Sequence, residues 1–130
     1  MLLQRRAFTK YHSAGLWSNA CCSHPRPDES ITSAARRRLP EEMGISVEPS
    51  SAFSFVYHAT FDNGLIEHEL DHVLLGVSDE DPTPHSDEVA EWRWASAAQI
   101  RAELVANPEH FTVWFRLCFE RTATIALAQS

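Results

Sequence analysis

The chain has 130 residues, of which 44% are hydrophobic and 22% are charged, and its formal net charge is −7. This length suits one domain over residues 1–130, and the composition excludes a disordered or fibrous protein. No apolar run approaches the roughly 18 residues of a membrane span, and the net negative charge argues against a general nucleic-acid binder. An odd number of cysteines and the lack of an apolar leader favour a reducing, cytoplasmic compartment.

Charge is unevenly distributed along the chain. Residues 1–40 contain seven basic residues and two acidic ones, whereas residues 41–130 contain four arginines and sixteen acidic residues. A basic first third on an acidic remainder favours an anionic ligand that the first third contacts. The alternative is that the surface charge is patchy by chance.

The first half of the chain predicts a strand, a long loop and a helix. The strand covers residues 1–6, and the loop covers 11–27, which contain glycine and two prolines but little periodicity. The helix is expected to begin in the segment Asp28–Ser30 and to run to about Met43, ending at Gly44. Pro40 lies inside this helix, so we expect a kink or an irregular final turn there.

The second half predicts three strands and two helices. Asp62, Asn63 and Gly64 form a hairpin-type turn between two strands, and Ser96 is a candidate helix cap. The predicted elements are strands over 53–59, 65–77 and 92–94, a loop over 78–88, and helices over 95–105 and 111–129. Strands mixed with three helices indicate an α/β or α+β sandwich.

Three carboxylates alternate along one predicted strand. Because the side-chain period of a strand is two, Glu67, Glu69 and Asp71 share one face. They indicate either a solvated acidic edge or a site for a hard cation such as Mg²⁺ or Mn²⁺. The neighbouring histidines are interpreted as ordinary strand residues: His58, His68 and His72.

A cysteine lies beside a histidine in the predicted loop before the first helix. Cys22 is followed by Ser23 and His24, and arginines lie on both sides of the segment. Positive surroundings favour a thiolate, so Cys22 is a candidate activated thiol, although a buried structural cysteine is the commoner case. Cys118 falls on the apolar face of the last helix and is expected in the core.

The first predicted helix carries a spacing that resembles the Nudix box, G-x5-E-x7-R-E-U-x-E-E-x-G-U, where U is aliphatic. Ser23 stands where the first glycine belongs, and Arg38 replaces a chemically important glutamate. The matching residues are Glu29, Arg37, Leu39, Glu41, Glu42, Gly44 and Ile45.

The rest of the chain points to one subgroup of that superfamily. The strings RRAFTK, GLWSN and CSHP, followed by YHA, GLIEHE, DEV, WRW and FTVWF, resemble type 1 isopentenyl-diphosphate isomerases in the same order. The resemblance covers essentially the whole chain. It implies a Nudix-like α/β/α sandwich with a mixed β-sheet.

The resemblance implies an isomerase of isoprenoid biosynthesis that interconverts isopentenyl diphosphate and dimethylallyl diphosphate. Such an enzyme protonates the alkene on one face and removes a proton on the other, which requires an acid and a base. Cys22 matches the catalytic thiol and Glu69 its acidic counterpart. Tyr57 matches the tyrosine that supports the proton of the glutamate, and Trp114 matches the aromatic that stabilises the carbocation.

The resemblance also implies binding groups for the prenyl diphosphate and for metal ions. Arg6, Lys10 and Arg38 match the diphosphate-binding cations. An Mg²⁺ ion that bridges the diphosphate is implied at Glu42 and the backbone of Cys22. A second site, for Mn²⁺, Mg²⁺ or Zn²⁺, matches three of the five family ligands in this chain: His24, Glu67 and Glu69.

The other two metal-binding histidines belong to an N-terminal segment of the family that these 130 residues do not contain. We therefore expect a form that is short at its N-terminus, monomeric or weakly dimeric, with a weakened metal site. His12 lies only two residues after Lys10 and is not expected to substitute. Two alternatives remain: a Nudix hydrolase of a nucleoside diphosphate derivative, and a non-catalytic remnant that binds prenyl diphosphate.

Overall fold

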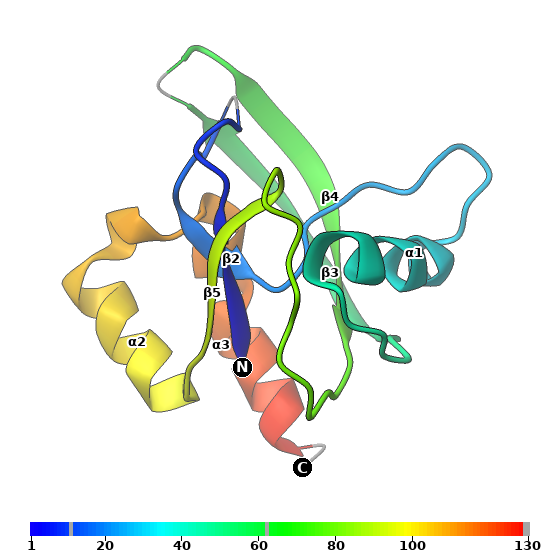
Figure 1. The fold of residues 1–130 in the computed structure, drawn as a ribbon. Helices are drawn as coiled ribbons and strands as arrows, with labels where there is room; N and C mark the ends of the chain where they lie inside the picture. The colour runs from blue at the N-terminus through cyan, green and yellow to red at the C-terminus, as the bar shows by residue number, and fades with distance from the viewer. Residues whose placement is uncertain (11, 62, 129–130) are drawn as a thin grey trace.

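The computed structural model describes residues 1–10, 12–61 and 63–128, in which strands and helices follow one another along the chain (Figure 1). No helix in this described part is long and apolar enough to cross a membrane. The elements are β1 Leu2–Arg6, β2 Trp17–Asn19, α1 Ile31–Met43, β3 Ser50–Thr60, β4 Ile66–Leu75, β5 Val89–Trp94, α2 Ala97–Ala106, a 3₁₀ turn Pro108–His110 and α3 Val113–Ala128.

Strand β1 is the middle strand of a three-stranded sheet with the order β2-β1-β5. Both of its ladders are antiparallel, and the β1–β5 register shifts between Arg5 and Arg6. Within the described residues, parallel pairing is confined to an isolated bridge between Trp17 and Phe111. Figure 1 shows α1 and α2 on opposite sides of the view, with α3 running behind this sheet.

Strand β1 buries side chains on both of its faces, as a layered sandwich requires. Leu3 packs with residues of α2 and α3, including Ile100 and Phe115. Leu2, which points to the opposite face, packs with Met43 at the end of α1. Because successive side chains of a strand alternate between faces, two adjacent leucines join both helical layers to one strand. This arrangement confirms the predicted α/β fold class.

Strands β3 and β4 form a separate antiparallel hairpin. Tyr57 pairs with Glu69 in its register, and the burial of β4 alternates from residue to residue. The face that carries Tyr57 contacts α3, and the predicted shared face of the carboxylates is confirmed. In the predicted turn, Gly64 has a φ of 85°, while residue 62 lies outside the described residues.

Helix α1 has the predicted ends. The Ser30 side chain accepts a hydrogen bond from the Ser33 backbone N–H, and Gly44 ends the helix with a φ of 67° and an N–H donated to the Pro40 carbonyl. The helix runs through Pro40 to Met43 as one uninterrupted element, and Gly44 donates to the Pro40 carbonyl, so the irregular final turn expected there is not observed. Pro40 has no N–H to donate to the carbonyl four residues earlier, and the helix therefore has one intrahelical hydrogen bond fewer.

Two short elements, strand β2 and the 3₁₀ turn Pro108–His110, fall where the sequence predicted none. Strand β2 lies within the segment 11–27 that was expected to be a loop, because Gln4 of β1 pairs with Ser18 across the ladder. Three residues carry too little periodicity to indicate a strand. Helix α2 has the predicted cap at Ser96, and the Gln99 side chain completes a reciprocal capping box.

Candidate active site

The Cys22 thiol lies at the end of β2, against the first turn of α3. Its Sγ donates to Asn19 Oδ1 at 3.3 Å, and Ser18 Oγ lies 3.5 Å away. Trp114 Nε1 donates to the same Asn19 oxygen at 3.2 Å. Ser18 is fully buried and bonds to Thr112 Oγ1 at 2.9 Å. Asn19, which belongs to the GLWSN string but was assigned no role of its own, therefore joins the thiol to the indole.

The surroundings of Cys22 favour the neutral thiol, whereas its neighbours in sequence suggested a thiolate. Burial raises the pKa of Cys22, and the hydrogen bond from Ser18 and the charge of Arg6 only partly offset this effect. The group is a neutral thiol at pH 7. A neutral thiol is suited to donate a proton, whereas the basic sequence context indicated an anionic nucleophile. Cys118 is buried in the core, as predicted.

Tyr57 brings the two carboxylates of β4 together. Its hydroxyl donates to Glu67 Oε2 at 2.7 Å and lies 3.5 Å from Glu69 Oε2. Burial and the nearby carboxylates raise the pKa of Tyr57, so the hydroxyl stays protonated and remains a donor. The ring of Tyr57 packs on Trp114, with centroids 6.4 Å apart.

Two histidines lie at the two ends of this carboxylate pair. His24, an expected ligand, is 79% exposed and lies 3.9 Å from Glu69 Oε1. His12, which was not expected to take part, is almost buried, with Nε2 at 3.0 Å from Glu67 Oε1 and its ring stacked on Phe61. Burial lowers the pKa of His12. No local pattern indicated this contact, because it joins a loop to a distant hairpin.

The residues expected to bind metal do not form a ready-made cation site. Among the described residues, no three histidine, cysteine, aspartate or glutamate side chains converge in a way that could hold an ion. Glu67 is occupied by Tyr57 and His12, and His24 points largely to solvent. Glu42 is 2% exposed, and its oxygens are bonded by Arg38, Cys21 and Gln4. The donor set has the chemistry that a divalent cation prefers, but in this structure these described side chains do not converge on one point.

Trp114 carries a cation on its ring. The Arg6 guanidinium carbon lies 5.2 Å from the ring centroid, a cation–π contact. Arg6 Nη2 makes a long bond of 3.5 Å to the His12 carbonyl, and its Nε is buried and has no hydrogen-bond partner among the residues that the structure describes. A buried donor without a partner costs free energy, which a bound ligand would recover.

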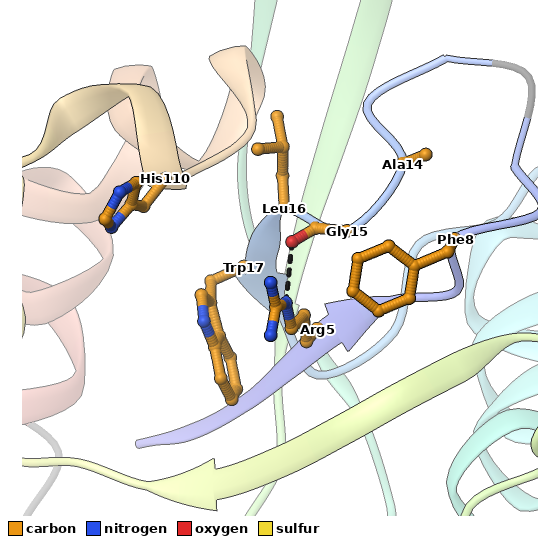
Figure 2. Close-up of a pocket in the computed structure, with 7 residues that line it drawn as sticks. All are labelled: Arg5, Phe8, Ala14, Gly15, Leu16, Trp17 and His110. Carbon is orange, nitrogen blue, oxygen red and sulfur yellow. Dashed lines mark hydrogen bonds between the residues drawn. The ribbon is translucent and has the colours of Figure 1, made fainter.

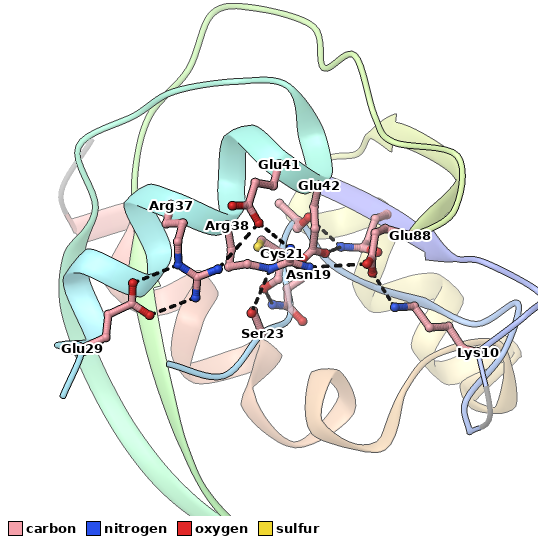
Figure 3. A network of polar contacts seen from close by, with 12 residues as sticks. Lys10, Asn19, Cys21, Ser23, Glu29, Arg37, Arg38, Glu41, Glu42 and Glu88 are labelled. Carbon is pink, nitrogen blue, oxygen red and sulfur yellow. Dashed lines mark hydrogen bonds and ion pairs between the residues drawn. The ribbon is translucent and has the colours of Figure 1, made fainter. Parts of the chain in front are cut away.

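Arg38 lies at the centre of a polar network (Figure 3). Its Nη1 donates to Glu41 at 2.6 Å, its Nη2 to Glu42 at 3.1 Å, and its Nε to Ser23 at 3.1 Å. Burial raises the pKa of Glu42, although the charge of Arg38 opposes this effect. The replacement that departs from the Nudix box therefore supplies a guanidinium to two of the box's own glutamates.

The same network reaches Lys10 through Glu88. Lys10 Nζ forms an ion pair with Glu88 Oε2, and Arg38 Nη2 lies 3.5 Å from Glu88 Oε1. Burial alone would raise the pKa of Glu88, but the hydrogen bond from Lys10 and the two positive charges outweigh it and lower the pKa. Glu88 belongs to the DEV string noted in the sequence, yet nothing local assigned it to the cations.

A separate open pocket of about 480 Å³ lies away from this network (Figure 2). Arg5 within it donates to the Gly15 carbonyl at 2.8 Å and pairs with Glu91 at 3.6 Å, so its charge is already compensated. The pocket contains none of the predicted site residues. Its lining is Arg5, Phe8, Ala14, Gly15, Leu16, Trp17 and His110.

Comparison with known proteins identifies the fold. The NUDIX domain family matches residues 1–115. Among solved structures, the MutT protein of Methanosarcina mazei superposes with a TM-score of 0.74 at 26% identity, covering 92% of this chain and 80% of that protein.

Sequence relatives narrow the family. Isopentenyl-diphosphate Delta-isomerase 1 of Aromatoleum aromaticum is 54% identical over 93% of this chain and 68% of its own length. The isopentenyl-diphosphate Delta-isomerase of Serratia proteamaculans is 52% identical over 88% of this chain and 64% of its own. The chain thus spans about two thirds of the length of these relatives. It belongs to the NUDIX domain family and, within that family, to the isopentenyl-diphosphate Delta-isomerases.

Proposed function

We propose that this chain catalyses the interconversion of isopentenyl diphosphate and dimethylallyl diphosphate. The observation that supports this most directly is a protonated thiol and a tyrosine-bonded carboxylate pair joined to the same indole. Cys22 is linked to Trp114 through Asn19, and Tyr57 packs on Trp114 while bonding Glu67 and Glu69. An alkene isomerase needs a donor and an acceptor of protons around a small apolar centre.

The proposed reaction adds one proton to the substrate and removes another proton from it. One of Cys22 and Glu69 donates a proton to the terminal alkene carbon, which leaves a tertiary carbocation. The other accepts a proton from the carbon on the far side of the cationic centre, and the double bond forms there. The product has the same atoms as the substrate. Tyr57 keeps its own proton and holds the carboxylate pair, which makes it a positioning residue for Glu69.

Trp114 is proposed to stabilise the transient cation. Its ring already accepts the guanidinium of Arg6, which indicates a π-face accessible to positive charge. Trp114 is 7% exposed and packs with Tyr57 and Ala59, and Phe55 and Phe61 lie beside them. Apolar walls of this kind keep water from capturing a carbocation as an alcohol.

Arg6, Lys10 and Arg38 are proposed to bind the diphosphate. Arg6 supports this most directly, because its buried Nε has no hydrogen-bond partner within the described residues. Lys10 and Arg38 have the right charge but are paired with carboxylates. Planar guanidinium groups match the geometry of phosphate oxygens, so two arginines and one lysine suit this ligand.

Divalent cations are a further part of the proposal. Mg²⁺ would bridge the diphosphate beside Glu42, and Mn²⁺, Mg²⁺ or Zn²⁺ would bind with His24, Glu67 and Glu69. When bound, such ions would neutralise negative charge on the ligand and on the carboxylates. Because these side chains do not converge without a ligand, no proton step here depends on an ion. We also propose a cytoplasmic protein that is monomeric or weakly dimeric.

The decisive experiment measures isomerisation of isopentenyl diphosphate by the wild type and by C22S. We expect C22S to lose turnover by about 10²–10⁴-fold, because the variant lacks the acid–base group, while inorganic pyrophosphate binds as before. The matched control is C21S, in which a hydroxyl still reaches Glu42, and it should retain turnover.

Two outcomes would reject this function. One is turnover by C22S at the level of the wild type. The other is release of phosphate from nucleoside diphosphate derivatives at rates above isomerisation, which would favour a hydrolase. Arg38 in place of the box glutamate is the feature that argues against such a hydrolase.

A further inference from the structure

Glu88 occupies a position that an anionic ligand would be expected to take. Its two carboxylate oxygens contact two different cations, Oε2 with Lys10 and Oε1 with Arg38 (Figure 3). These are two of the three residues proposed to bind the diphosphate. A carboxylate whose two oxygens engage two cations resembles a phosphate group in charge and in the spacing of its acceptors.

The two cations are compensated by carboxylates before any ligand arrives. Arg38 contacts Glu41, Glu42 and Glu88. All three of its side-chain nitrogens, Nε, Nη1 and Nη2, have a partner in the protein. Two positive charges thus face three carboxylates. Because the carboxylates outnumber the two cations, this group does not attract a diphosphate while all three carboxylates hold their places.

Of the three carboxylates, Glu88 is the one that bridges both cations. Glu42 is fixed on α1 and buried, with bonds from Gln4 and Cys21. Glu41 contacts Arg38 without an ion pair to Lys10. Glu88 retains 29% exposure at its side chain, so its carboxylate has solvent to move into.

The backbone of Glu88 is held independently of its side chain. Its N–H donates to the His85 carbonyl at 3.0 Å, and its carbonyl accepts from the Ala7 N–H at 3.1 Å. The next residue, Val89, is buried at the start of β5. A side-chain rotation therefore releases the carboxylate from both cations without moving the strand.

We propose that Glu88 is an internal counter-anion of the diphosphate site, which holds Lys10 and Arg38 in the free protein and is displaced by the diphosphate. This inference rests on the proposed function, because it takes these cations as the diphosphate ligands. Only a ligand that brings more negative charge than one carboxylate displaces Glu88 well. Glu88 therefore raises the selectivity for a diphosphate over a monophosphate.

The test is calorimetric binding of inorganic pyrophosphate and inorganic phosphate, without metal, to the wild type and to E88Q. Glutamine keeps the shape of the side chain but removes the competing charge. We expect E88Q to bind pyrophosphate about five- to tenfold more tightly, and its preference for pyrophosphate over phosphate to shrink. In isomerisation, KM should fall with kcat within about twofold, because the lost interaction exists only in the free protein.

Two variants serve as controls. E91Q removes the same charge from β5 at a residue that pairs with Arg5, outside the network, and should stay within about twofold of the wild type. E88D retains the charge and should behave as the wild type. For each variant, the increase in Tm on adding pyrophosphate is measured relative to its own ligand-free Tm. This increase reports binding even if E88Q is less stable than the wild type.

The outcomes separate the two levels of proposal. Pyrophosphate binding by the wild type that is unchanged or weaker in E88Q overturns the role of Glu88 and leaves the proposed function standing. Tighter binding by E91Q to the same extent also overturns it, since general charge would then explain the gain. If neither wild type nor E88Q binds pyrophosphate, with or without Mg²⁺, the proposed diphosphate site fails and the inference fails with it.

Discussion

A single hydroxyl orders the acidic side of this site at the residue scale. Tyr57 donates one proton, yet two carboxylates lie within reach of it, at 2.7 and 3.5 Å. Two adjacent carboxylates repel each other. The Tyr57 hydroxyl, which both of them contact, and the partly buried His12 beside Glu67 reduce that repulsion. The phenol therefore determines where the Glu69 oxygens lie relative to Trp114.

The variant Y57F tests this positioning role. It keeps the ring that packs on Trp114 and removes the hydroxyl, so we expect kcat to fall about 10- to 100-fold while KM changes little. Phe55, the neighbouring aromatic on the same face, provides the control variant F55L. Equal losses in Y57F and F55L would indicate packing alone.

Local sequence predicted some of these residues and not others. The shared face of Glu67 and Glu69 follows from the period of a strand, and the structure confirms it. The contacts of His12 with Glu67 and of Glu88 with Lys10 span about 55 and 78 positions of the chain. Such contacts depend on tertiary packing, which no local periodicity encodes. The protonation of Cys22 depends on tertiary packing as well, since burial raises the pKa of its thiol.

At the scale of elements, helix ends were the most predictable features. Gly44 and Ser96 cap helices as the sequence indicated, and Ser30 caps α1 within the segment where the helix was expected to begin. Each of the three satisfies free backbone groups at a helix end. Strand β2 was missed because its three residues are ordered by the β1 ladder rather than by their own pattern. Gly44 has a second role that the sequence did not reveal. The chain around Thr83 packs directly on it, and the Thr83 N–H donates to the Met43 carbonyl at 2.8 Å.

The variant G44A should therefore destabilise more than a left-handed backbone alone explains. A Cβ at Gly44 would lie 2.3 Å from the Thr83 carbonyl oxygen, whereas a Cβ at Gly64 meets nothing within 4 Å. Both glycines have positive φ, 67° and 85°, so G64A is a matched control. We expect urea unfolding to give losses of about 2–4 kcal/mol for G44A and about 1 kcal/mol for G64A. Equal losses would refute the clash.

Across the whole molecule, the basic first third is matched by acids from the rest of the chain. Arg5 pairs with Glu91, Arg36 with Glu48, and Lys10 with Glu88. The charge pattern in the sequence favoured an anionic ligand for these cations, but the structure shows that many of their partners are carboxylates of the protein itself. This is why composition alone could not indicate which cations face a ligand.

Stability should depend on pH through a further ion pair, between Glu29 and Arg37. Hydrogen bonds from Arg37 and from the Arg26 backbone lower the pKa of Glu29 from 4.5 to about 2. Because the folded value is depressed, this contribution is complete above about pH 4.5 and is lost as the pH falls towards 2. E29Q should therefore be less stable than the wild type at pH 6, and the difference should shrink by pH 2–3. Urea midpoints across this range measure it, and parallel curves for the two proteins would contradict it.

The bond between Ser18 and Thr112 has a consequence for how the pocket adapts to a guest. It ties β2 to the start of α3, and the Thr112 N–H donates to the Trp17 carbonyl at 2.9 Å, so thiol and indole belong to one stiff block. In the described part of the chain, the β3–β4 hairpin shares no ladder with that block. A change in the distance between Cys22 and the carboxylates of β4 would therefore require the β3–β4 hairpin to move relative to β2 and α3.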